Sequence, residues 1–137
     1  MAFVGGQFLE VTYNHPTLGT GVLFPKSGED NTLDLGGNRS ADDANMVTAN
    51  GQMIDQMNYV RGSFEATIAN DMNTNLEVEK MNALANSPVL SDWTFTHING
   101  AVYAGKGKPV GDIQANTNAA TFTLKVAFTG KVAKIAG

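Results

Sequence analysis

Strict alternation of apolar and polar side chains over residues 121–129 constrains the fold of this chain more than any other feature of its sequence. Phe122, Leu124, Val126 and Phe128 alternate there with threonine, lysine and alanine, which is typical of a β-strand with one buried face. Burying one large apolar side chain contributes about 1.5–3 kcal/mol. A shift of one residue would expose all four, at a cost of about 6–12 kcal/mol, so the register of this strand is firmly set.

Other segments show strand-like patterns bounded by turn residues. The expected strands are Phe8 to Asn14, Thr20 to Phe24, Gln52 to Val60, Ser63 to Ala69 and Trp93 to Ile98. The first two flank Pro16 and Gly19, which predicts a hairpin. The third and fourth are predicted to pair through a tight turn at Arg61 and Gly62. Glycine is plentiful, at 15 residues, as suits a chain with many reversals.

Only one segment has helical periodicity. Thr74 to Glu77 has the form of a capping box, in which the threonine oxygen accepts a hydrogen bond from a backbone amide and the glutamate returns one. The apolar residues that follow at helical spacing are Val78, Met81, Leu84 and Ala85. Ser87-Pro88 is expected to end the helix. One helix among several strands predicts a mainly β protein, with residues 1–137 forming a single domain.

A long segment, residues 27–51, shows neither period. It is rich in glycine, aspartate, asparagine and serine and has few large apolar residues. A connection of this length inside a compact domain is usually functional or is ordered by a partner. It is therefore a candidate contact segment.

Composition excludes several classes of function. The chain has no cysteine, which excludes disulfides, thiolate zinc sites and cysteine nucleophiles. Its net charge is -4, without the basic footprint of a protein that grips nucleic acid. No apolar run approaches the roughly 20 residues of a membrane-spanning helix, and the start of the chain does not resemble a secretory signal. We expect a protein of the cytoplasm, or of a particle assembled there.

The stretch GAVYAGKG, Gly100 to Gly107, comes within one residue of a phosphate-binding loop. Gly107 stands where a magnesium-binding hydroxyl is required, and the following Lys108-Pro109 does not favour the helix that would receive the phosphates. We interpret the stretch as a strand end, Ala101 to Ala104, followed by a mobile glycine-lysine turn.

Signals for catalysis or metal binding are weak. Asp30 to Gly36 hints at a calcium loop, but its glycine comes one place late and no glutamate closes it. His15 and His97 are far apart in sequence, and His97 is interpreted as a packed, hydrogen-bonded residue. No serine lies in a nucleophile elbow. We predict no catalytic, cofactor-binding or metal-binding residue, and no enzyme activity.

Two patches of the sequence resemble tail tube proteins of contractile-tailed bacteriophages. The patches are Asp34 to Asn45 leading to Met53 to Met72, and Asp92 to Gly100 leading to Gly105 to Gln114 and Ala119 to Lys125. The second patch combines a strand, an Asn-Gly turn, the run Gly-Lys-Pro-Val-Gly-Asp and an alternating last strand, and it is the more telling of the two. Together the patches span a little over half of the chain.

The resemblance implies a small antiparallel β-sandwich or barrel with one flanking helix, in subunits that form hexameric rings. Stacked rings would make the inner tube of a phage tail, which conducts double-stranded DNA into the host during ejection. The implied partners are copies of the same chain, the tail sheath protein, baseplate and tail terminator proteins, and DNA in transit, with no membrane. The implied location is the virion, assembled in the host cytoplasm.

The resemblance also suggests roles for individual residues. Residues expected to line the lumen are Gln56, Asn58, Ser63, Glu65 and Thr67, with Thr123 and Lys125 as an alternative set. Residues of the long segment expected to contact the next ring are Asp30, Asp34, Arg39, Asp42 and Asp43. Helix residues expected to face the sheath are Glu77, Glu79 and Lys80.

Two alternatives stay open. The first is the inner tube of a type VI-like secretion system or of a phage-tail-like particle, which would carry effectors instead of DNA. The second is a monomeric β-sandwich binding module that uses the segment Gly105 to Gly111 as its binding loop. Such a module should cluster exposed aromatic residues near this loop, where the sequence places only Tyr103.

Overall fold

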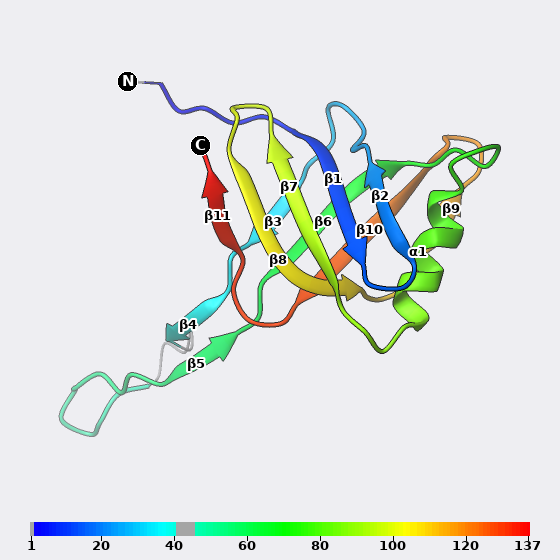
Figure 1. Ribbon diagram of the computed structural model, residues 1–137. Coiled ribbons are helices and arrows are strands. Elements are labelled where there is room, and N and C mark those ends of the chain that lie inside the picture. The colour runs from blue at the N-terminus through cyan, green and yellow to red at the C-terminus, as the bar shows by residue number, and fades with distance from the viewer. Residues whose placement is uncertain (1, 41–45) are drawn as a thin grey trace.

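The computed structural model describes residues 2–40 and 46–137 (Figure 1). Its strands are β1 (Phe8–His15), β2 (Gly19–Leu23), β3 (Thr32–Asp34), β4 (Gly37–Ser40), β5 (Met57–Val60), β6 (Ser63–Ala69), β7 (Ser91–His97), β8 (Val102–Pro109), β9 (Ala115–Asn116), β10 (Thr121–Phe128) and β11 (Ala133–Ala136), and its helix is α1 (Glu77–Asn86). All strand pairs are antiparallel. The prediction of a mainly β fold with one helix is confirmed.

The main sheet has the strand order β2-β1-β7-β8-β10-β6-β3 and folds over at β8. One edge of β8 pairs with β7 along most of its length. Its other edge is divided between β11, opposite residues 102–104, and β10, opposite residues 107–109. The segment that follows β2 then reaches β6, where the Lys26 amide donates to the Thr67 carbonyl at 2.8 Å and the Ala69 amide donates to the Phe24 carbonyl at 2.9 Å. The two ends of the sheet thus meet around one core, and we call this closed sheet the barrel.

Aromatic side chains fill this core. Phe64 stacks on Phe95 with ring centroids 4.4 Å apart, and Phe8 and Phe128 meet Phe95 edge-on. Trp93 is fully buried and donates its indole N–H to the Gly107 carbonyl at 3.0 Å. The four alternating apolar residues of β10 are all buried, so the register predicted for that strand is confirmed. The β1–β2 hairpin and β6 were also predicted correctly.

The predicted turn after Ala104 is wrong, because β8 continues through the glycine-lysine run to Pro109. The glycines allow close packing and do not reverse the chain. A Cβ atom at Gly105 would lie 2.7 Å from the Phe128 ring, and one at Gly107 would lie 2.1 Å from the Ala127 carbonyl oxygen. The segment therefore forms a wall of the barrel, and the loop expected for a binding module is largely absent.

The predicted pairing of residues 52–60 with β6 is also wrong. β5 pairs with β4 in a separate two-stranded sheet, and β6 pairs with β10 and β3. The reason lies at Gly62, whose amide donates to the Gly130 carbonyl at 2.7 Å and whose carbonyl accepts from the Phe128 amide at 3.0 Å. These bonds hold residues 61–62 extended between β5 and β6, so no tight turn forms.

The helix begins differently from the prediction. Its N-cap is Leu76, which has φ 51° and no side-chain capping bond, so the capping box is wrong. The Thr74 hydroxyl instead donates to Asp71 Oδ2 at 2.7 Å, and Glu77 Oε2 accepts from the Asp71 amide at 2.6 Å. The apolar stripe was predicted correctly, since Met81 and Leu84 are fully buried against the barrel.

Candidate functional site

An arm projects from the barrel at the end where β3 leads into β4 (Figure 1). We define the arm as β4, β5 and the described connection, residues 46–56. Backbone bonds extend the hairpin towards its tip, from the Ile54 amide to the Met46 carbonyl at 2.8 Å and from the Thr48 amide to the Gln52 carbonyl at 2.7 Å. The long segment predicted as a loop is thus partly ordered as strands β3 and β4.

Polar contacts fix the root of the arm. The Arg39 guanidinium donates to both carboxylate oxygens of Asp34, and the Gly36 amide donates to Asp34 Oδ1 at 3.0 Å. The Arg39 hydrogen bonds, followed by that from Gly36, hold the pKa of the Asp34 carboxyl below its usual value. Gly36 has φ 77°, and a Cβ atom there would lie 2.6 Å from the Gly62 amide nitrogen. The arm therefore leaves the barrel in a set direction.

The arm exposes large apolar side chains. Met53, Met57 and Tyr59 have exposed fractions of 72%, 59% and 58%. Val47 and Ile54 are also exposed. A two-stranded hairpin is marginally stable alone in water, and apolar side chains gathered on a protruding element mark an interaction surface. Sequence reasoning missed this surface, because the strand-like pattern of residues 52–60 predicts pairing with the next strand.

The predicted contact residues of the long segment do not form one cluster. Asp34 and Arg39 lie at the root of the arm, where they pair with each other. Asp30 precedes β3 and lies at the opposite end of that strand. Asp42 and Asp43 lie outside the described residues.

The outward face of β6 and β10 is hydrophilic. Ser63, Glu65 and Thr67 point away from the core and lie opposite Ala127, Lys125 and Thr123 in the antiparallel register. The β6 members of the first set of lumen candidates therefore share one face with the alternative set, Thr123 and Lys125. Three of these six residues carry hydroxyl groups, and Glu65 and Lys125 are direct cross-strand neighbours.

Gln56 and Asn58 do not belong to this face. Asn58 lies in β5 opposite Arg39 of β4, and Gln56 precedes β5 on the arm. Their grouping with Ser63 depended on the β5–β6 pairing, which does not form. Both side chains are exposed, so they contribute to the surface of the arm.

The helix presents two of its three predicted contact residues. Glu79 and Lys80 are exposed. Glu77 is only 6% exposed and accepts the Asp71 amide bond. Its carboxylate therefore orders the loop before the helix and is not presented on the helix surface.

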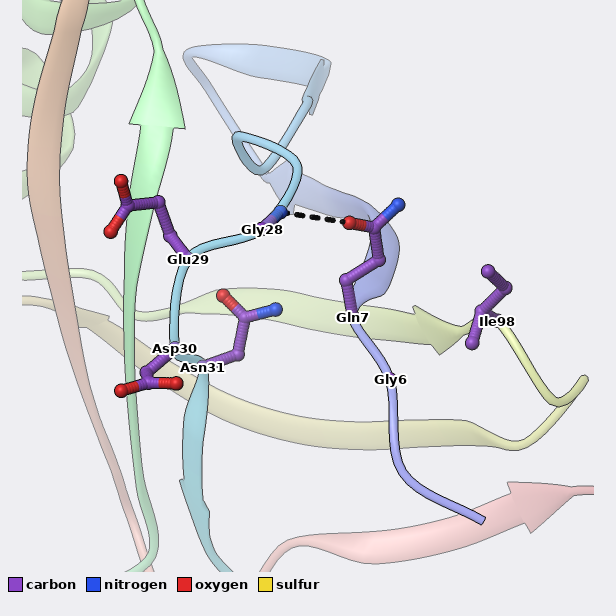
Figure 2. Close-up of a pocket in the computed structure, with 7 residues that line it drawn as sticks. All are labelled: Gly6, Gln7, Gly28, Glu29, Asp30, Asn31 and Ile98. Carbon is purple, nitrogen blue, oxygen red and sulfur yellow. Dashed lines mark hydrogen bonds between the residues drawn. The ribbon is translucent and has the colours of Figure 1, made fainter.

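A polar pocket of about 560 Å³ lies beside the start of β1 and the β2–β3 connection (Figure 2). Gln7 Oε1 accepts from the Gly28 amide at 3.3 Å across it. The amide of Asn31 is buried there, without a hydrogen-bond partner among the described residues. Figure 2 shows Glu29 and Asp30 pointing away from Gln7, and Glu29 pairs with Lys26 at 3.4 Å. These carboxylates therefore do not converge on a cation site.

His15 and Ser87 form the one contact in the described chain that resembles part of a catalytic triad, with His15 Nε2 2.9 Å from Ser87 Oγ. His15 Nδ1 accepts the backbone amides of Thr17 and Leu18 at 3.1 and 3.0 Å. The proton of the neutral ring must then be on Nε2, which donates to the serine. A serine nucleophile needs the opposite arrangement, so this contact is structural, joining β1 to the end of α1.

His97 is a hydrogen-bonded residue as predicted. Its Nε2 lies 2.9 Å from the Gly6 carbonyl, and its Nδ1 accepts from the Asn99 amide at 3.2 Å. In residues 2–40 and 46–137, no three His, Asp or Glu side chains are grouped as a metal ion would require. No helix of this part of the chain has the length and apolar character needed to cross a bilayer.

Comparison of the sequence with models of known protein families finds no match, and comparison with curated proteins finds none either.

Proposed function

We propose that this chain is a non-enzymatic structural subunit whose copies assemble into hexameric rings, stacked as the inner tube of a contractile phage tail that conducts DNA. The observation that carries the proposal is the arm, which places apolar side chains such as Met53 and Met57 in solvent, away from the barrel. Burying each of them would contribute about 1.5–3 kcal/mol. A subunit that buries its arm against a neighbour gains this energy on assembly.

Unpaired strand edges support the same proposal. β3 pairs only with β6 and β11 pairs only with β8 among the described strands, so each leaves one edge open to a strand of a neighbour. The contact between residues 24–26 and β6 closes the sheet on that side. Backbone sharing between subunits would therefore use β3, β11 or the arm, and not the β2–β6 side.

The hydrophilic face of β6 and β10 suits a passage for DNA. Its hydroxyl groups and the cross-strand neighbours Glu65 and Lys125 give no excess of positive charge. Affinity for DNA rises with each phosphate that a cation neutralises. A bore lined by this face would let the duplex pass without retaining it.

The alternatives differ in what they require. A secretion tube shares the proposed assembly and differs in its cargo. The binding module needs a loop at residues 105–111, most of which lies within β8, so the structure favours it less.

Imaging of the purified protein by negative-stain electron microscopy, with sedimentation velocity, tests the assembly. We expect rings or tubes of uniform diameter at high protein concentration, and a persistent monomer would contradict the proposal. A variant with residues 41–55 replaced by a short glycine-rich turn should fold and fail to stack. The deletion must leave β3 intact, because that strand pairs with β6.

A further inference from the structure

A second pocket, of about 400 Å³, lies at the root of the arm. Leu90, Val110 and Phe128 form its apolar lining, and Arg61 and Lys108 stand beside them. Arg61 directly follows β5, and Lys108 is the second-to-last residue of β8. We call this pocket the root pocket.

The two cations of the root pocket have no acidic partner among the described residues. The ion pairs among the described residues are Lys26 with Glu29 and Arg39 with Asp34, and neither includes Arg61 or Lys108. Lys106 and Lys125 have acidic cross-strand neighbours, whereas Lys108 lies opposite Ala127. A guanidinium and an ammonium beside an apolar lining would complement a ligand that combines a carboxylate with apolar groups.

The arm carries this combination of groups. Its Asp55 is exposed and directly follows the exposed apolar residues Met53 and Ile54. Ser40 Oγ donates to Asp55 Oδ1, which orients the carboxylate, and the second oxygen has no hydrogen bond to the described part of the chain. Among the described residues of the arm, Asp55 is the one carboxylate, and the one cation, Arg39, is paired with Asp34.

We propose that the root pocket of one copy binds the Met53–Asp55 segment of the arm of a second copy, with the Asp55 carboxylate paired to Arg61 and Lys108. This inference rests on the proposed self-assembly. Asp55 stands five residues before Val60, about 17 Å along an extended strand, and its own arm points away from the barrel (Figure 1). An arm therefore reaches the pocket of a neighbour and not its own.

Such a contact is head-to-tail, since it joins two different surfaces of the same chain. Head-to-tail contacts repeat from copy to copy and produce rings when the rotation closes, or filaments when it does not. Both products fit a stacked tube. Each arm would then cover the root of the arm of the next copy.

Cysteine cross-linking tests the contact without background, because the natural chain has no cysteine. Asp55→Cys protein is mixed with Lys108→Cys protein and oxidised, and the cross-linked peptides are identified by mass spectrometry. We expect a disulfide between positions 55 and 108 of different copies. The control mixture replaces the second variant with Lys80→Cys, at an exposed site on α1. Equal yields in the two mixtures would overturn the inference.

Charge reversal gives an independent measurement. Arg61→Glu combined with Lys108→Glu should raise the protein concentration needed for half-assembly by about tenfold or more. Adding Asp55→Lys to the same chain should restore assembly, whereas a merely misfolded variant would not be rescued. Unchanged assembly of the double variant would contradict the pocket.

Electron microscopy of the cross-linked samples separates the two proposals. Tubes without the 55–108 disulfide would overturn the root pocket and leave the tube function standing. The disulfide in dimers without rings would support the pocket and overturn the tube function. If neither rings nor the disulfide form, both proposals are overturned.

Discussion

Replacement of Gly107 by alanine should destabilise the barrel more than any other single methyl addition on β8. The new Cβ atom would lie 2.1 Å from the Ala127 carbonyl oxygen, far inside van der Waals contact, so β8 and β10 must separate. The Gly107 carbonyl also accepts the indole bond of the buried Trp93. Overpacking costs about 1–3 kcal/mol, and loss of a buried hydrogen bond costs about 1–3 kcal/mol more.

The expected loss of about 2–6 kcal/mol is large against a typical total of about 5–15 kcal/mol. Urea unfolding of the monomer, followed by the fluorescence of Trp93, measures it. The chain has one tryptophan, fully buried, so its emission reports on the core. With a urea dependence of about 1–3 kcal/mol per molar, the midpoint should fall by at least about 0.7 M.

Gly5→Ala is the matched control, because a Cβ atom at Gly5 meets nothing within 4 Å. It should change the free energy of unfolding by less than about 0.5 kcal/mol. A Gly107→Ala protein as stable as this control would refute the close approach of β8 to β10, and with it the argument that the glycine-lysine run is a strand.

Three further predictions concern polar side chains. His15→Ala should lower the free energy of unfolding by about 1–3 kcal/mol, because it removes a buried side chain that bonds to Ser87 and accepts from the Thr17 and Leu18 amides, while His97→Ala, at a more exposed site, should cost less in the same calorimetric comparison. Arg39→Ala should raise the pKa of Asp34 towards its ordinary 3.8, as measured by carboxyl NMR titration; since the folded pKa is lowered, the stabilisation is present above about pH 4 and is lost as the pH falls below it. Burial, followed by the charge of the nearby Glu77, raises the pKa of Tyr13 above 10.0, so stability should decline as the pH rises beyond that value, and Tyr13→Phe should abolish the decline in alkaline unfolding curves.

The elements predicted correctly from the sequence are those in which the spacing of the apolar residues shows which face is buried. β10 and β6 were predicted because their alternation fixes both strand type and register, and the stripe of α1 because Met81 and Leu84 recur at helical spacing. Errors arose where a residue has more than one structural use. The glycines of residues 105–107 favour a turn by composition, yet they serve a close approach between two strands that are distant in sequence.

Competing hydrogen bonds account for the errors at the helix start and at the arm. Thr74 and Glu77 have capping-box spacing, but both side chains bond to Asp71 instead, since the loop before the helix offers them competing partners. The arm was missed because β5 looks like the first strand of a hairpin with β6. Only the bonds of Gly62 to β10 and to Gly130 decide against that turn, and no local pattern shows them.

Gly62 also connects the core to the proposed assembly surface. Its carbonyl bonds to Phe128, which closes the aromatic core, and a Cβ atom at this position would lie 2.7 Å from the buried Val132. Arg61 of the root pocket is its chain neighbour, and the last strand of the arm ends one residue earlier, at Val60. A change that loosens the core at Gly62 must therefore also shift the arm and the root pocket. The direction of the arm and the shape of the pocket would then depend on the same packed residues. Because the arm of one copy must fit the pocket of the next, this shared dependence keeps the two surfaces matched.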